Sequence, residues 1–295
     1  MDTESIIYQD RSSYNPLFPL FIYFDPLSKV SGVPLHWHDE IELITVMEGC
    51  VDLLYKGDPI VLHKNDIAFI NSSYVHGFYA NGPSCKPAMT RAILLNPNLL
   101  SSNGYDIIQS KYINPLISGE LTTPVCISPD TKNAGQLREN LDKISNLFTM
   151  NEKGKELQIK AALFEMLYFI MDLSEKKQNA DVAENIQRKS DFELIKKALS
   201  YIYAHKSDKI HVKEIADHLC MSEGHFSRFF KHMTRQTPVE FINEYKIGEA
   251  AKMLRKTDMK EIDISLEIGF NNFSYFISVF KKLLHCTPSE YRNQA

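Results

Sequence analysis

Residues 222–241, SEGHFSRFFKHMTRQTPVEF, are echoed fifty positions later by residues 272–291, NFSYFISVFKKLLHCTPSEY. An aromatic pair four residues apart, Phe226 and Phe230 in the first copy, recurs in the second copy, and a Thr-Pro dipeptide follows each pair. Two copies are too few for a repeat array. They indicate one supersecondary unit that occurs twice.

Each copy, with the residues before it, has the pattern of a helix, a tight turn and a second helix. The upstream helical segments, HVKEIADHLCM and EIDISLEIGF, each place a small residue, Ala216 or Ser265, where two helices can approach closely. Ser222 or Asn272 is a suitable N-cap for the second helix, whose aromatic residues share one face. This is the helix-turn-helix pattern, in which the second helix normally enters the major groove of DNA. A helix over residues 238–255 is expected to join the two units.

The residues of both copies strongly resemble the DNA-binding domain of the AraC/XylS family of bacterial transcription regulators. The resemblance covers roughly residues 195–292. It rests on FSRFFK followed by TPVEF in the first copy, and on GF, SYF and VFKK followed by TPSEYR in the second. It implies two helix-turn-helix units on a long connecting helix, with the double-stranded DNA of a promoter operator, RNA polymerase and a second copy of the chain as partners.

The expected DNA contacts follow from this resemblance and from helix geometry. In the first unit Arg228 lies opposite the aromatic face, where an arginine can bind a guanine in two places. The second unit departs from the family, because its usual Ser-Arg pair is Ile277-Ser278 here, so that no arginine reads a base and Lys281 remains for phosphate. The predicted DNA-binding residues are Ser222, Gly224, His225, Ser227, Arg228, Lys231, Asn271, Asn272, Phe273, Ser274, Ile277, Ser278 and Lys281.

Short apolar runs of strand length occupy the first third of the chain. They are FPLFIYF, IELITVM, VDLLY, IVLH, IAFI, HGFYA and TRAILL, and turn residues such as Glu48-Gly49 separate them. Evenly spaced short strands with such turns predict an antiparallel barrel or sandwich. The expected fold class is therefore α+β multidomain, with an antiparallel β-barrel before an all-α domain.

The spacing His36-x-His38-x3-Glu42, with His76 further along the chain, lies within these runs. It resembles the first motif of the cupin barrel, whereas the second cupin motif is only partly present. Positions 36, 38 and 42 share strand parity, so all three side chains can point into one cavity. The AraC family commonly carries a cupin-like sensor domain ahead of its DNA-binding domain, so the two resemblances support each other.

Three interpretations of this cluster remain open. The family resemblance favours a site for an organic effector, with a carbohydrate as the leading candidate, formed by His36, Trp37, His38, Glu42 and His76 without a metal or other cofactor. Imidazole and carboxylate groups would also suit zinc, iron, nickel or manganese, so the three histidines and Glu42 could instead form a metal site. In the third interpretation the same side chains are exposed or hydrogen-bonded at the barrel mouth.

Two longer helical patterns follow the strands, over residues 136–150 and 155–173. The second is apolar over a wide arc, and the resemblance implies that this pair forms the contact of a homodimer, for which Leu163 and Ile170 are the residues to test. Polar residues without an apolar period then indicate a linker. The expected domains are a cupin-like effector-binding and dimerisation domain over residues 1–173, a linker over 174–190 and the DNA-binding domain over 191–295.

The net charge of the chain is −4, but residues 1–190 carry −6 and residues 191–295 carry +2. So small a basic excess means that DNA binding would depend on placed side chains more than on bulk charge. The five cysteines are scattered without a CxxC pair and are expected to be thiols. The N-terminus lacks the apolar core of a signal peptide, and no apolar stretch is long enough to cross a membrane, so a cytoplasmic protein is expected.

The sequence thus predicts a cytoplasmic, homodimeric transcription activator whose DNA binding is controlled by a small molecule in the N-terminal barrel. It is not expected to be an enzyme. Two rival interpretations are a metal-dependent cupin enzyme fused to a DNA-binding domain and a regulator that has no effector. A bound metal would favour the first rival, and the lack of any stabilising ligand would favour the second.

Overall fold

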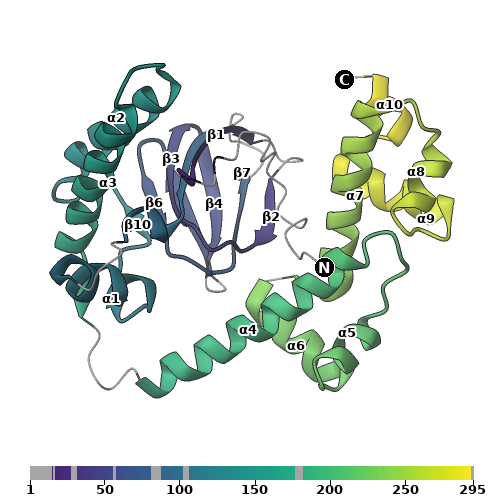
Figure 1. Ribbon diagram of the computed structural model, residues 1–295. Coiled ribbons are helices and arrows are strands. Elements are labelled where there is room, and N and C mark those ends of the chain that lie inside the picture. Colours follow the sequence, from purple (N-terminus) through teal and green to yellow (C-terminus); the bar gives the residue numbers. More distant parts are fainter. Residues whose placement is uncertain are drawn as a thin grey trace.

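The computed structural model describes residue 15 and residues 17–27, 32–55, 58–80, 88–101, 106–176, 182–234 and 236–293. A β-rich domain comes first and a helical domain follows it (Figure 1). This order confirms the expected fold class.

Two antiparallel sheets form the N-terminal domain. The larger has the strand order β1 (Leu20–Leu27), β8 (Ala88–Leu95), β3 (Ile41–Glu48), β6 (Ile67–Ile70) and β10 (Cys126–Ile127). The smaller has the order β2 (Val33–His36), β7 (His76–Ala80), β4 (Cys50–Tyr55) and β5 (Asp58–His63). One apolar cluster joins their inner faces, with Ile44 and Val46 from the larger sheet and Leu53 and Phe78 from the smaller. The sheets therefore form an open, cupin-like barrel.

Short elements connect the sheets to the helices that follow. They are η2 (Pro97–Leu99), η3 (Gln109–Ile113), α1 (Asn114–Ile117) and a small sheet of β9 (Leu121–Thr122) with β11 (Glu175–Lys176).

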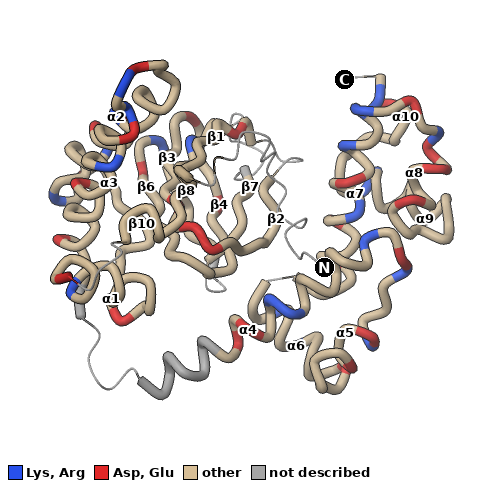
Figure 2. Tube along the Cα trace, in the orientation of Figure 1, with Lys and Arg blue, Asp and Glu red and all other residues tan. Residues whose placement is uncertain are grey.

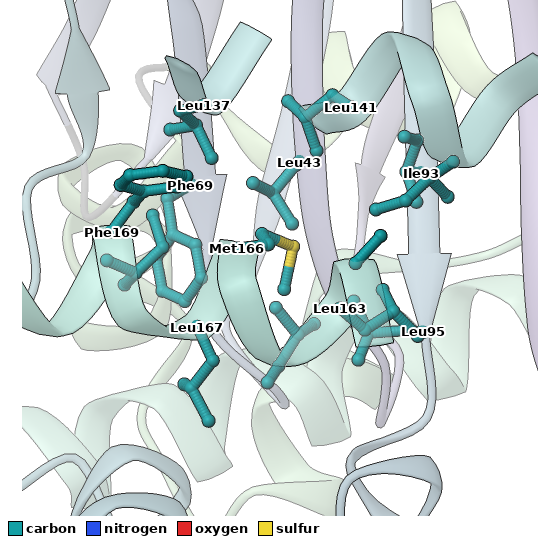
Figure 3. Packing of buried hydrophobic residues seen from close by; sticks show 14 of the residues in the cluster. Leu43, Phe69, Ile93, Leu95, Leu137, Leu141, Leu163, Met166, Leu167 and Phe169 are labelled. Carbon is teal, nitrogen blue, oxygen red and sulfur yellow. The ribbon is translucent and has the colours of Figure 1, made fainter. Parts of the chain in front are cut away.

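Two helices, α2 (Ala134–Thr149) and α3 (Lys155–Asp172), cover the outer face of the larger sheet (Figure 1). Their apolar side chains pack on that face, and the cluster includes Leu43, Phe69, Ile93, Leu95, Leu137, Leu141, Leu163, Met166, Leu167 and Phe169 (Figure 3). Leu163 and Ile170 are fully buried in this cluster. The choice of these two as dimer-contact residues is therefore wrong, because the arc of α3 that holds them packs on its own sheet.

The C-terminal domain consists of seven helices within the residues described. They are α4 (Val182–Ala204), α5 (Val212–His218), α6 (Glu223–Thr234), α7 (Pro238–Lys256), α8 (Glu261–Glu267), α9 (Phe273–Leu284) and α10 (Pro288–Asn293). The repeat is confirmed, since α5–α6 and α8–α9 are two helix-turn-helix units with α7 between them. Phe226 and Phe230 are fully buried in the first unit, and Phe276 and Phe280 in the second.

Local sequence explains where α7 begins. Thr237 is its N-cap and forms a capping box with Glu240, and Pro238 occupies the first turn, where a missing N–H costs nothing. The helix α4 differs from expectation, because it begins at Val182, inside the stretch assigned to the linker. Of the residues of that stretch that precede α4, 174–176 are described and 177–181 lie outside the residues described.

Two further observations concern the cysteines and the membrane. Cys126, Cys220 and Cys286 are free, whereas Cys50 is disulfide-bonded, so the expectation of thiols alone is wrong for Cys50. Among the residues described, no helix is both long enough and apolar enough to span a bilayer.

Candidate functional site

The residues of the first unit that were predicted to contact DNA lie on α6 and at the position just before it. Ser222, Gly224, His225, Arg228 and Lys231 are exposed, and Ser227 is half-buried. The opposite face is held by Phe226 and Phe230, whose rings lie 5.4 Å apart and pack beside α7. A buried aromatic face on one side therefore orients the polar face toward solvent.

The helix α9 repeats this arrangement with different chemistry. The Asn272 side chain caps the helix by accepting a hydrogen bond of 2.9 Å from the backbone N–H of Tyr275. Asn271, Asn272, Ser274, Ser278 and Lys281 are exposed, as predicted, whereas Phe273 and Ile277 are half-buried. The Phe273 ring stacks on the Phe276 ring with centroids 6.0 Å apart, so part of Phe273 packs against the hydrophobic core.

Tyr275 is an exposed residue of α9 that sequence reasoning missed. Its side chain is 48% exposed, and its hydroxyl accepts a hydrogen bond of 3.0 Å from the amide of Asn243 on α7. The spacing could have shown it, because Tyr275 lies on the side of α9 that Asn272 and Ser278 also occupy. Acidic and basic residues both occur at several positions along the described C-terminal helices (Figure 2).

A second cluster lies in the barrel, where His36, His38, Glu42 and His76 come together. Their potential ligand atoms all lie within 4.8 Å of one another, and all four residues are buried. The prediction that these residues converge is confirmed by this geometry, but the reason given for it is wrong. His36 ends β2 and Glu42 belongs to β3, with His38 in the connection, so the chain bends between them and strand parity does not apply.

Backbone carbonyl groups orient all three imidazole rings. Nδ1 of His36 lies 2.8 Å from the carbonyl oxygen of Pro34, and Nδ1 of His76 lies 2.8 Å from that of Tyr74. Nδ1 of His38 lies 3.0 Å from the carbonyl oxygen of Glu40. Because a carbonyl oxygen only accepts, each Nδ1–H is the donor, and Nε2 is left to face the cluster.

The Nε2 atoms surround the Glu42 carboxylate. Oε2 of Glu42 lies 2.8 Å from Nε2 of His76 and 3.2 Å from Nε2 of His38. Ring centroids lie 4.4 Å apart for His36 and His76 and 4.9 Å apart for His38 and His76. The four side chains form one compact, buried polar group.

Burial and mutual charge set the protonation of this group. Burial, followed by the neighbouring His76 and His38, lowers the pKa of His36 to about 3, so His36 is neutral. Burial alone would lower the pKa of His38, but the hydrogen bond and charge of Glu42 raise it above its ordinary value. Burial alone would raise the pKa of Glu42. The contacts with His38 and His76 outweigh this effect, so the pKa of Glu42 is lowered. Glu42 is therefore ionised.

The barrel and the helical domain share a buried contact beside this cluster. Leu35 on β2 and Val75, next to β7, pack with residues of α4 to α7 in one apolar cluster. The Tyr203 hydroxyl on α4 donates a hydrogen bond to the carbonyl oxygen of Leu35, and the Tyr74 ring meets Phe192 edge-on at 5.2 Å. Trp37, predicted to flank the effector, packs against this interdomain cluster.

Comparison with known protein families identifies both parts of the chain. The family description "AraC-like ligand binding domain" matches residues 28–167, which contain the histidine cluster. The description "Helix-turn-helix domain" matches residues 215–294, which contain both α6 and α9. The two matches do not overlap and together cover most of the chain.

Individual relatives agree with these family matches. An uncharacterised HTH-type transcriptional regulator of Bacillus subtilis, YdeC, is 25% identical over 88% of this chain and 86% of its own length. The HTH-type transcriptional activator RhaR of Mannheimia succiniciproducens is 22% identical over 99% of this chain and 93% of its own. The xylose operon regulatory protein of Haemophilus influenzae is 34% identical over 34% of this chain and 26% of its own.

Proposed function

Because this chain belongs to the AraC family of transcription regulators, we propose that it activates transcription from promoters that it recognises through both α6 and α9. The observation that carries the proposal is the pair of helices with buried aromatic faces and exposed polar faces, with α7 between the two units. The residues proposed to contact DNA are those predicted from the sequence. RNA polymerase is the proposed protein partner, and the cytoplasm is the proposed location.

The test is selection of binding sites from a random pool of DNA with the full-length protein. Two conserved half-sites in the selected sequences, one for each unit, are expected. A pool that yields no preferred sequence, at a salt concentration where non-specific binding is weak, would reject the proposal.

The barrel is the proposed binding site for an organic effector, with the histidine cluster as its polar group. A carbohydrate is the first class to test, because a xylose operon regulatory protein is similar to part of this chain. A ligand that binds the native protein must raise its thermal stability. A panel of sugars and sugar acids, measured with the wild type and with Glu42→Gln, should give at least one shift that the variant loses. A panel without any shift would argue against a carbohydrate.

A homodimer is proposed through the outward face of α3. Leu157 is 77% exposed and Tyr168 is 61% exposed, although both are large apolar side chains. They are eleven positions apart, which is close to three helical turns, so both lie on the side of α3 that faces away from the sheet. A second copy of the chain, bound symmetrically, would cover both.

A further inference from the structure

The two helix-turn-helix units have separate hydrophobic cores, and α7 contributes to both of them. Phe241 and Tyr245, in the first half of α7, pack with α5 and α6. Ile247 and Leu254, in the second half, pack with α8 and α9. Lys246 is the residue between these two sets. Because each unit packs on its own half of α7, contacts made directly from one unit to the other also decide how the two units are oriented.

Lys246 is buried, with 3% of its surface exposed. A lysine is rarely buried to this extent, because its ammonium group loses the hydration that it has in water. Two backbone carbonyl groups replace that hydration. The ammonium group donates hydrogen bonds to the carbonyl oxygens of Asp208, at 2.5 Å, and Gly269, at 3.3 Å. Asp208 lies in the loop before α5 and Gly269 lies in the turn between α8 and α9, so one ammonium group binds both units.

The turn of the second unit is shaped for this contact. A Cβ atom at Gly269 would stand 2.4 Å from the carbonyl oxygen of Asp208 and 2.5 Å from Nζ of Lys246. Cys220 occupies the equivalent position in the first unit, and both turns have a positive φ angle, +55° at Cys220 and +72° at Gly269. Since the first unit keeps a side chain in this conformation, the conformation alone does not require a glycine. The missing side chain at position 269 instead allows the close approach of Lys246 and the Asp208 backbone.

A second contact joins the first half of α7 to α9 at the surface. The Asn243 amide donates a hydrogen bond of 3.0 Å to the Tyr275 hydroxyl. Water competes for this exposed hydrogen bond, whereas Lys246 is buried. A charged donor also forms a stronger hydrogen bond than a neutral amide does. Lys246 is therefore the stronger of the two links.

We propose that Lys246 is a positioning residue that fixes the orientation of α9 relative to α6, and so sets the distance between the two half-sites that the protein recognises on DNA. Lys246 itself contacts no base, because it is buried between the two units. The setting of the half-site distance rests on the proposed function, whereas the fixed orientation of the two helices does not.

The geometry of DNA makes this distance a sensitive test of orientation. Successive major-groove faces lie roughly 34–36 Å apart, or about 10–10.5 base pairs. One additional base pair between the half-sites turns the second half-site by roughly 35° and moves it by about 3.4 Å. Helices held in a fixed orientation cannot follow this displacement without losing contacts, whereas loosely joined helices can.

Lys246→Met tests the link, because methionine is flexible and apolar and has no hydrogen-bond donor. Lys256→Met is the matched control, since it removes the same charge from α7 at an exposed position. Lys246→Gln, which keeps a polar amide at the position, is a second variant, so that the test does not depend on the folding of the methionine variant. Circular dichroism and thermal unfolding of the full-length protein show which variants are folded.

The first measurement is the distance between the two units in the full-length protein without DNA. Nitroxide labels are attached through an introduced keto amino acid at Lys213 on α5 and Glu267 on α8, both exposed, so that the native cysteines are not labelled. An excess of unlabelled chain prevents distances between protomers from contributing. The wild type and Lys256→Met should give one narrow distribution of distances, and the Lys246 variants should give a broader or shifted one. Equal distributions in all folded variants would overturn the proposal.

The second measurement is the tolerance of DNA binding to half-site spacing. The starting DNA is a sequence selected with the wild-type protein, and one base pair is inserted or removed between its half-sites. The wild type and Lys256→Met should bind each altered DNA at least about 5-fold more weakly, the lower end of the loss when one base contact is misplaced. The Lys246 variants should lose less than about 2-fold, while their affinity for the first half-site alone should equal that of the wild type.

A loss of stability alone would not produce this pattern, because it would weaken binding at every spacing alike. Equal sensitivity to spacing in the Lys246 and Lys256 variants would therefore overturn the proposal. A wild type that prefers no DNA sequence would instead reject the proposed function, and the distances between the labels would then decide separately whether Lys246 fixes the orientation of the units.

Discussion

The backbone of Gly269 lies so close to Asp208 that a Cβ atom at position 269 would stand 2.4 Å from the carbonyl oxygen of Asp208. Gly269 forms the turn between α8 and α9 with φ +72°, a conformation that residues with a side chain rarely adopt. This contact ties the second helix-turn-helix unit to the loop that precedes the first.

Replacement of Gly269 by alanine should lower the free energy of unfolding by at least about 2 kcal/mol, because it combines a steric clash with backbone strain. The measurement is denaturant unfolding of the full-length protein. Gly248→Ala in α7 is the matched control, since a Cβ atom there meets nothing within 4 Å. It should stabilise the protein by roughly 0.5–1 kcal/mol through helix propensity. Similar effects of the two changes would contradict this account of Gly269.

Lys246 on α7 should make stability depend on pH in the alkaline range. Its ammonium group donates hydrogen bonds to the carbonyl oxygens of Asp208, at 2.5 Å, and Gly269, at 3.3 Å. Burial lowers the pKa of Lys246 to about 8 from its ordinary 10.5. Between these two values the unfolded chain holds a proton that the folded chain has lost, so raising the pH through this window favours the folded state.

The check is the difference in unfolding free energy between the wild type and Lys246→Met, measured from about pH 7 to about pH 11. Taking the difference removes the contributions of other titrating groups. The wild type should gain stability relative to the variant across the window. A difference that stays constant with pH would show that the lysine keeps its ordinary pKa.

The two units should read DNA unequally. Arg228 on α6 and Ser278 on α9 occupy equivalent positions in the two units, and both are exposed. A two-point contact between arginine and guanine carries roughly 1–3 kcal/mol of discrimination, and a serine hydroxyl should carry less. Arg228→Ala should therefore relax the preference for one or two guanines in one half-site, whereas Ser278→Ala should change the selected sequences little.

Lys281→Ala provides a contrast to these two variants. A phosphate contact carries no sequence information, so this change should weaken binding to all DNA sequences alike. It should also reduce the salt dependence of DNA binding by about one ion. Selection from a random DNA pool measures the first property, and titration at several salt concentrations measures the second. Equally sharp half-sites that survive Arg228→Ala would refute the asymmetry.

Charges on the outward face of α3 should dissociate the proposed dimer. Leu157→Glu combined with Tyr168→Glu should lower the mass in analytical ultracentrifugation without loss of folded structure, because both side chains are exposed. Leu163→Ala serves as a contrast: this residue is fully buried against the sheet, so the change should cost about 2–5 kcal/mol and leave the mass unchanged. A dimer that persists in the double variant would place the contact elsewhere.

The sequence was most informative where a repeat or a period expresses one physical requirement. The aromatic pairs that begin with Phe226 and Phe276 predicted both helix-turn-helix units, because aromatic residues four positions apart share one face of a helix and that face must be buried. The start of α4 could not be predicted in this way, since residues 182–190 show no apolar period and helix propensity alone is a weak signal.

The histidine cluster shows a different limit. The spacing of His36, His38 and Glu42 indicated convergence, but the bend after β2 that produces it depends on how His36 pairs with His76 across two strands. Burial of Leu163 was also invisible, because an apolar helix face looks the same whether it packs on a sheet or on another protomer. The disulfide of Cys50 was missed because scattered cysteines carry no spacing signal.

The contact between the barrel and the helical domain has a consequence for which mutations would change regulation. Leu35, Val75 and Tyr203 belong neither to the polar cluster nor to the predicted DNA contacts, yet each lies in the contact between the two domains. Selection for a reporter gene that is expressed without its inducer should therefore recover alleles at these positions repeatedly. Such alleles would change the level of expression without inducer, while the inducer and the promoter sequence that the protein recognises stay the same. Regulation could therefore evolve without changes in either binding surface.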